Sequence, residues 1–132
     1  MNAATGALAP AQIAKMIDHA LLRPELTSAD VLDGCGLAAR HDVGTVCVKP
    51  VDVAIAHDAL ADTDVLVGTV IAFPHGSLSG AMKAAEAEHA LENGARELDM
   101  VSTSGACARE STTWSRPRSR RSSPLPEERR SR

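Results

Sequence analysis

Residues 10–101 alternate between short β-branched apolar runs and helical stretches, and this rhythm constrains the fold more than any other feature. The runs predicted as strands are 18–22, 45–48, 65–73 and 96–101. Apolar side chains at helical spacing predict helices over 11–17, 28–40, 52–60 and 79–93. Strands that alternate with helices through short turns favour right-handed βαβ units and a parallel sheet. The predicted fold class is therefore α/β.

The composition changes abruptly after Val101. Residues 1–101 contain six Lys and Arg against fourteen Asp and Glu, whereas residues 102–132 contain eight Arg, three Glu and few apolar side chains. Such a charge asymmetry indicates a segment that has its own partner or one that does not fold. We therefore expect a flexible arm over residues 1–9, an ordered region over 10–101 and a disordered basic tail over 102–132.

The three cysteines, Cys35, Cys47 and Cys107, are odd in number and include neither a CxxC pair nor a histidine at metal-ligand spacing. This pattern argues against a disulfide framework and against a zinc site, and it favours a reducing compartment. The chain shows no signal-peptide pattern and no run of about 18 apolar residues. The expected location is the cytoplasm.

Ligand sites of parallel α/β folds form at the C-terminal ends of the strands. Asp99 is the sharpest candidate because it lies inside a predicted strand, between Leu98 and Met100. Burying an unpaired carboxylate costs on the order of several kcal/mol or raises its pKa. Folds tolerate that mainly where proton transfer or ion pairing requires it. A catalytic role and an ion pair with a nearby lysine both remain open for Asp99.

Other candidates lie at or near the strand ends. Adjacent strand positions point to opposite faces, so one of Asp18 and His19 can face the site while the other faces the helices. The alternative is a strand-end pair that binds a loop. Lys49 could form a Schiff base if desolvated, although most such lysines are solvated. His75 lies in a predicted turn and is expected to be exposed, and Cys47 is expected to serve packing.

Four segments match one known family in order and spacing, from about residue 10 to residue 101. They are Met16–Pro24 (MIDHALLRP), Val46–Pro50 (VCVKP), Gly68–Pro74 (GTVIAFP) and Glu92–Val101 (ENGARELDMV). In these segments the chain resembles the deoxyribose-phosphate aldolases, which are class I aldolases. The resemblance implies a (β/α)8 TIM barrel, of which this chain holds about four βα units. It also implies reversible cleavage of 2-deoxyribose 5-phosphate into glyceraldehyde 3-phosphate and acetaldehyde, through a lysine Schiff base and without metal or cofactor.

Carried over residue by residue, the resemblance makes Asp99 the proton donor and acceptor beside the Schiff-base lysine. It places Asp18 and Cys47 in the lining of the same pocket. The family's Schiff-base lysine lies on the sixth strand and its partner lysine on the seventh, and this chain has no counterpart of either. We therefore expect a phosphorylated sugar as the family substrate, but no aldolase activity from these 132 residues alone.

The chain departs from the family pattern at Ala20, where threonine is usual, at Lys49, where asparagine is common, and at His75. A different barrel enzyme or a small, non-catalytic α/β binding module therefore stays an alternative. Half a barrel would leave two open strand edges, which favour self-association.

The tail is interpreted as translation in a shifted reading frame. Restoring one base after the codon for Val101 allows the reading IDVGRVREGVDDLVEAEIAAV, an acidic amphipathic helix like the one that follows the fourth strand in the family. The alternative takes the Arg-rich tail as an arm that binds nucleic acid. That alternative is the weaker one, because the tail has one Trp and no Phe or Tyr on which bases could stack.

Overall fold

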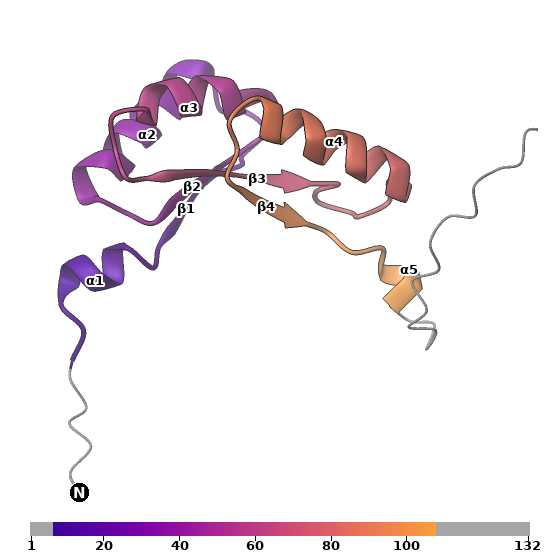
Figure 1. Ribbon diagram of the computed structural model, residues 1–132, viewed down its shortest axis with the longest axis horizontal. Coiled ribbons are helices and arrows are strands. Elements are labelled where there is room, and N and C mark those ends of the chain that lie inside the picture. Colours follow the sequence, from indigo (N-terminus) through magenta and orange to yellow (C-terminus); the bar gives the residue numbers. More distant parts are fainter. Residues whose placement is uncertain (1–6, 108–132) are drawn as a thin grey trace, which may run out of the picture.

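The computed structural model describes residues 7–107, which form a four-stranded sheet with helices packed on one face (Figure 1). The strands are β1 (Asp18–Leu21), β2 (Thr45–Val48), β3 (Leu66–Ile71) and β4 (Glu97–Met100). The helices are α1 (Pro10–Ala14), α2 (Ser28–His41), the 3-10 turn η1 (Pro50–Asp52), α3 (Val53–Leu60), α4 (Gly80–Glu92) and α5 (Ser104–Cys107). The predicted α/β class is confirmed.

The strands pair in sequence order, β1-β2-β3-β4, and each pair is parallel. Helices α2, α3 and α4 connect successive strands and lie on the same side of the sheet (Figure 1), as crossovers of one hand require. We call the opposite side the open face, because none of these three helices covers it. Strands β1 and β4 are the two edges of the sheet.

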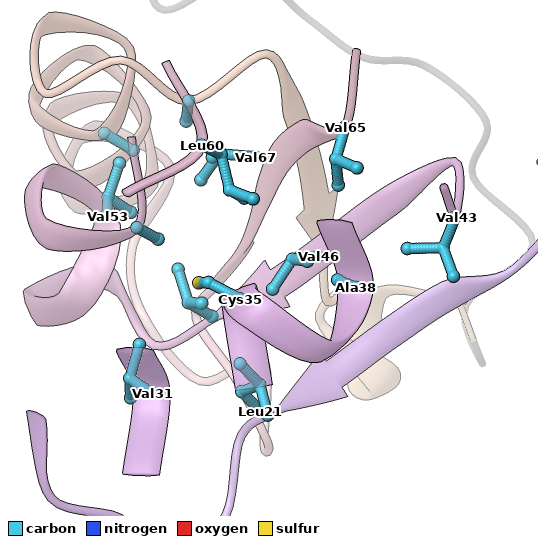
Figure 2. Packing of buried hydrophobic residues seen from close by; sticks show 14 of the residues in the cluster. Leu21, Val31, Cys35, Ala38, Val43, Val46, Val53, Leu60, Val65 and Val67 are labelled. Atoms are coloured by element: carbon cyan, nitrogen blue, oxygen red, sulfur yellow. The ribbon is translucent and has the colours of Figure 1, made fainter. Parts of the chain in front are cut away.

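The hydrophobic core lies between the sheet and the helices. Alternate strand residues point into it, as the pleat of a strand dictates. The core residues from the strands are Leu21, Val46, Val48, Val67 and Ile71. The side chains that cover them include Val31, Cys35 and Ala38 of α2 and Val53, Ala56 and Leu60 of α3 (Figure 2). Each fully buried valine contributes about 1.5–3 kcal/mol, so this one-sided core holds the sheet and helices together.

Side-chain caps fix the starts of two helices. The Thr27 hydroxyl accepts the N–H of Asp30, and the Asp30 carboxylate accepts the N–H of Thr27 at 2.8 Å, which makes a capping box at α2. The Ser79 hydroxyl accepts the N–H of Met82 at the start of α4. These starts agree with the predicted helices from residues 28 and 79.

Strand β3 and helix α1 both end earlier than predicted. Ala72 has a φ of 58°, in the left-handed region, and its N–H donates to the Glu86 carboxylate at 2.8 Å. The chain therefore turns out of the sheet right after β3. Helix α1 ends at Ala14 because the Ile17 carbonyl accepts the N–H groups of Gly44 and Thr45, which draws this segment towards the sheet.

Two predicted segments fall largely outside the described residues. They are residues 1–6 of the arm and residues 108–132 of the tail. The start of the predicted tail is described, and its residues 104–107 form α5. No helix within residues 7–107 has the length and apolar character needed to cross a bilayer.

Candidate active site

Three of the predicted site residues meet on the open face of the sheet. A carboxylate oxygen of Asp18 on β1, the Cys47 sulfur on β2 and a carboxylate oxygen of Asp99 on β4 all lie within 4.8 Å of one another. Strand β3 separates β2 from β4, and its residue beside Cys47 is Gly68. Gly68 has no side chain, and a Cβ atom added there would lie nearest to Thr45 and Glu97, which flank the cluster.

The strand register explains why residues far apart in sequence meet. Cys47 pairs with Gly68, whereas the residue of β3 that pairs with Asp99 is Val70. Asp18 is the first residue of β1 and pairs with Thr45. It therefore lies at the N-terminal end of its strand, whereas the prediction placed it at a C-terminal end. Successive strands of a barrel-like sheet are staggered along the barrel axis. Side chains at different positions along their strands can therefore occupy the same level.

Negative charge dominates this cluster. Partial burial raises the pKa of Asp18, and the neighbouring Asp99 and Glu97 raise it further. Burial also raises the pKa of the Cys47 thiol to about 11, with additional contributions from Asp18, Asp99 and Glu97. At neutral pH Cys47 is therefore a protonated thiol and not a reactive thiolate. Within residues 7–107, no ion pair reaches Asp18 or Asp99.

Asp99 is exposed, which corrects the expectation that its carboxylate is buried in the strand. The cause is its place on an edge strand and on the open face, where no helix covers it. The alternative of an ion pair between Asp99 and a lysine is also not found among the described residues. His19 points away from the cluster and lines a groove with His41, so Asp18 and His19 do face opposite sides.

Lys49 and His75 take no part in the cluster. The Lys49 ammonium donates to the Leu26 carbonyl at 3.0 Å and lies 3.3 Å from the Asp52 carboxylate. It therefore ties the end of β2 to the loop before α2, and it is not free to act as a nucleophile. His75 is exposed in the loop after β3, as predicted.

Two polar features escaped the sequence analysis. The Thr45 hydroxyl donates to the Glu97 carboxylate at 2.7 Å, next to the cluster on the open face. Glu97 precedes Asp99 by two positions, so strand alternation would have placed both on one face. Thr45 gives no comparable signal, because its contact depends on the register of three strands.

Lys83, a buried lysine on α4, is the second missed feature. Its ammonium donates to the Val101 carbonyl at 2.7 Å and to the Thr103 hydroxyl at 3.2 Å, and that hydroxyl donates to the Gly76 carbonyl at 3.1 Å. These bonds hold the segment after β4 against the loop after β3, beside the Asp99 end of the sheet. A charged residue in a helix normally indicates a solvated face, so the sequence pattern predicts an exposed Lys83 and not a buried one.

Two hollows flank the sheet. A groove of about 670 Å³ is lined by apolar residues of α1 and α2, such as Ile13 and Leu37, and none of the three cluster residues lines it. A smaller hollow of about 320 Å³ is lined by Lys49, Phe73 and other residues at the C-terminal ends of β1, β2 and β3. Val70 also lines it, and Val70 is the register partner of Asp99. None of the three cluster residues lines this hollow either, and its link to the cluster is Val70 alone.

The chain is similar to curated aldolases over most of its length. It is 48% identical over 94 residues to a deoxyribose-phosphate aldolase of Geobacillus sp. (strain WCH70), and the match covers 71% of this chain and 42% of the relative. It is 47% identical over 93 residues to deoxyribose-phosphate aldolase 2 of Staphylococcus aureus (strain N315), covering 70% of this chain and 42% of the relative. The chain thus spans less than half the length of these relatives. No protein-family model matches it.

The solved structures that resemble this chain are also aldolases. The chain superposes on the deoxyribose-phosphate aldolase of Aeropyrum pernix, described as having a unique tetrameric structure, with a TM-score of 0.70 and 31% identity. That match covers 74% of this chain and 42% of the other. A second neighbour, the aldolase QR15, gives a TM-score of 0.69 at 32% identity. Over its four-stranded half-sheet the chain is therefore similar in sequence and in structure to deoxyribose-phosphate aldolases, of which it spans less than half.

Proposed function

We propose that this chain carries the acid/base portion of an aldol-cleaving site whose complete form acts on 2-deoxyribose 5-phosphate. The observation that carries the proposal is the position of Asp99, which meets Asp18 and Cys47 on the open face of a parallel half-sheet. In the complete (β/α)8 fold that face would become the barrel interior. The hollow beside Val70 would then open towards the substrate.

The proposed chemistry needs two groups. An amine condenses with the substrate carbonyl, and the resulting iminium accepts the electron pair of the breaking C–C bond. A carboxylate takes the proton from the substrate hydroxyl as that bond breaks and returns a proton later. We assign the carboxylate role to Asp99. Asp18, whose pKa is raised by burial and by Asp99, would share the proton within the pocket.

No lysine of this chain lies in position to supply the amine. Lys15 pairs with Asp42, Lys49 with Asp52, and Lys83 binds the carbonyl of Val101. The sequence contains no other lysine. We therefore propose that the 132-residue chain is inactive and that the amine belongs to the part of the barrel it lacks.

A complementation experiment tests this proposal. Residues 1–101 would be joined to the complementary part of the Geobacillus aldolase, and the fusion assayed with 2-deoxyribose 5-phosphate. We expect cleavage by the fusion and none by the 132-residue chain. A folded fusion without activity would count against the proposed function. An acetaldehyde adduct trapped by borohydride on the 132-residue chain would refute its inactivity.

We also propose that the reading frame shifts near Val101. The support is the change from an acidic, apolar-rich composition to an Arg-rich one at the point where β4 ends. Sequencing the gene across the codon for Val101 decides this directly. A missing base at that point is the expected result, and an intact frame through the codon would end the hypothesis.

Self-association is the last element of the proposal. β1 and β4 each present an unpaired strand edge, and such edges recruit further strands. The expected result is a mass that rises with protein concentration in light scattering after gel filtration. A monomer at every concentration, with a sharp two-state unfolding transition, would contradict it.

A further inference from the structure

Lys83 on α4 is a charged side chain that is buried without a carboxylate partner. It is 7% exposed, and within residues 7–107 no carboxylate lies at ion-pair distance from its ammonium. The ammonium donates instead to two neutral oxygens, the Val101 carbonyl and the Thr103 hydroxyl. Burying a charge in this way is unfavourable. An apolar side chain would cover the same surface without that penalty, so packing alone does not account for the charge.

The bond from Lys83 holds the chain at the point where the backbone pairing of β3 and β4 stops. Just past β4, the Val101 N–H donates to the Ile71 carbonyl at 2.9 Å. Strand β3 then turns out of the sheet at Ala72, whose φ is 58°. The Val101 carbonyl accepts the Lys83 ammonium at 2.7 Å. A side chain of α4 therefore takes over from the backbone ladder at this residue.

Helix α4 is itself bound to the end of β3, which gives the Lys83 ammonium a fixed base. Glu86 lies three positions after Lys83, and its carboxylate accepts the Ala72 N–H at 2.8 Å. Residues three apart are neighbours on a helix surface. The loop after β3 also meets the segment after β4, because a Cβ atom at Gly76 would collide with the Ser102 carbonyl. Helix α4 thus holds the ends of β3 and β4 in one fixed relation.

Asp99 lies two residues before Val101, and side chains two apart in a strand share a face. Asp99 is exposed on an edge strand, and no ion pair within the described residues holds its carboxylate. The backbone around it therefore decides where that carboxylate lies. Placement matters in catalysis, since an error of about 1 Å can lower a rate by about 100-fold.

We propose that Lys83 is a positioning residue, which fixes the end of β4 and thereby the reach of the Asp99 carboxylate in aldol cleavage. The inference rests on the proposed function of Asp99. Lys83 stays bound to the Val101 carbonyl and neither condenses with the substrate nor transfers a proton. Its effect on the reaction passes through the backbone from Val101 to Asp99.

The fusion of residues 1–101 with the complementary part of the Geobacillus aldolase tests this role, because it keeps the Val101 carbonyl. Lys83→Met should lower kcat by about 10- to 100-fold through misplacement of Asp99. It should change KM by less than about twofold, since substrate binding does not use Lys83. Lys15→Met is the matched control, which removes a surface pair with Asp42 and should leave both constants unchanged. A higher KM with an unchanged kcat would overturn the proposal.

A double variant separates the placement of Asp99 from a general loss of structure. Once Asp99→Asn has removed the group that moves the proton, its exact position no longer affects the rate. Adding Lys83→Met to Asp99→Asn should therefore lower kcat by less than about threefold more, because the two residues act as one unit. A further loss as large as that in the parent fusion would mean that Lys83 acts on something other than Asp99.

Amide hydrogen exchange of the 132-residue chain gives a test without catalysis. Lys83→Met should speed exchange of the Val101 amide by about tenfold or more, because the strand end opens more often. The control is the Leu66 amide, which donates to the Gly44 carbonyl at 3.0 Å at the other end of β3 and should keep its rate. Equal acceleration of both amides, or none at Val101, would contradict local positioning.

A milder substitution covers the case in which Lys83→Met does not fold. Thr103→Val removes one of the two acceptors of the Lys83 ammonium and should speed exchange at Val101 but not at Leu66. An unchanged Val101 rate in that variant would count against the proposal. An inactive parent fusion would tell against the proposed function, whereas the exchange rates would still decide whether Lys83 holds the segment that carries Asp99.

Discussion

Thr45 and Glu97 are hydrogen-bonded side chain to side chain although a whole strand lies between them. The Thr45 hydroxyl on β2 donates to the Glu97 carboxylate on β4 at 2.7 Å. The intervening residue on β3 is Gly68, the register partner of Glu97. A Cβ atom at Gly68 would lie 3.1 Å from the Thr45 methyl group and 3.4 Å from the Glu97 Cβ. The contact therefore exists because residue 68 has no side chain.

Substituting Gly68 tests this relationship. We expect Gly68→Val to force Thr45 and Glu97 apart and to destabilise the chain by about 1–3 kcal/mol, the usual cost of overpacking. The measurement is the urea midpoint followed by far-ultraviolet circular dichroism. Gly80→Ala is the control, because an added Cβ at Gly80 meets no atom within 4 Å. Equal midpoints for the two variants would show that the space at Gly68 is not needed.

Lys83 offers a second test, on the segment that follows β4. Lys83→Met keeps the apolar stem but removes the donor to the Val101 carbonyl and the Thr103 hydroxyl. We expect a loss of about 1–3 kcal/mol, because a buried acceptor is left without its partner. Lys15→Met removes a surface pair with Asp42 and should cost about 0–1 kcal/mol. Thermal unfolding of the two variants gives the two losses of stability. A larger loss for Lys15→Met than for Lys83→Met would contradict a stabilising role for the Lys83 hydrogen bonds.

Most of the fold could be predicted from the sequence because local pattern and tertiary structure agree. The β-branched run from residue 45 to residue 48, and the helical spacing of apolar side chains over 28–40 and 79–93, each indicated an element that forms. The end of β3 could not be predicted. It depends on a left-handed Ala72 whose N–H binds a carboxylate fourteen residues away, and alanine carries no local signal for that conformation.

The candidate site was predictable in its residue types and less so in its environment. The pleat and the family resemblance both indicated Asp99, and a parallel sheet brings it near Asp18 and Cys47. Its exposure was not predictable, because burial of an edge strand depends on what packs beyond it. The roles of Thr45 and Glu97 were missed for a related reason, since cross-strand contacts follow register, which sequence alone does not fix.

Asp18 provides a test of the site's electrostatics. Its pKa in the folded chain is raised above 3.8 by burial, Asp99 and Glu97. Ionised Asp18 therefore disfavours the folded state, and its contribution to stability falls as pH rises from the ordinary aspartate pKa through the raised one. We expect Asp18→Asn to raise the urea midpoint at neutral pH, in metal-free buffer, and to change it little in acid.

The control for that series is Asp58→Asn, an exposed substitution on α3, remote from the open face. It should leave the midpoint nearly unchanged at both pH values. A lower urea midpoint for Asp18→Asn at neutral pH would contradict like-charge repulsion at Asp18. A rise in the midpoint that is equally large in acid would contradict it as well.

Asp99 is the residue on which the proposed reaction depends most, and the fusion with the complementary aldolase part allows it to be tested. Asp99→Asn keeps the size and polarity of the side chain but cannot accept a proton. We expect kcat to fall by about 10²–10⁴-fold, the range for loss of a general acid/base group. The lysine would still condense with acetaldehyde, so borohydride should still trap an adduct on the variant.

Glu97→Gln is the matched comparison, because Glu97 lies on the same strand and face, two positions earlier. Its carboxylate is engaged by Thr45, so a glutamine that still accepts this bond should lower kcat much less. Equal losses for the two variants would mean that the total charge of the open face, and not a proton relay through Asp99, supports the reaction. Loss of the trapped adduct in Asp99→Asn would point instead to a role in placing the amine.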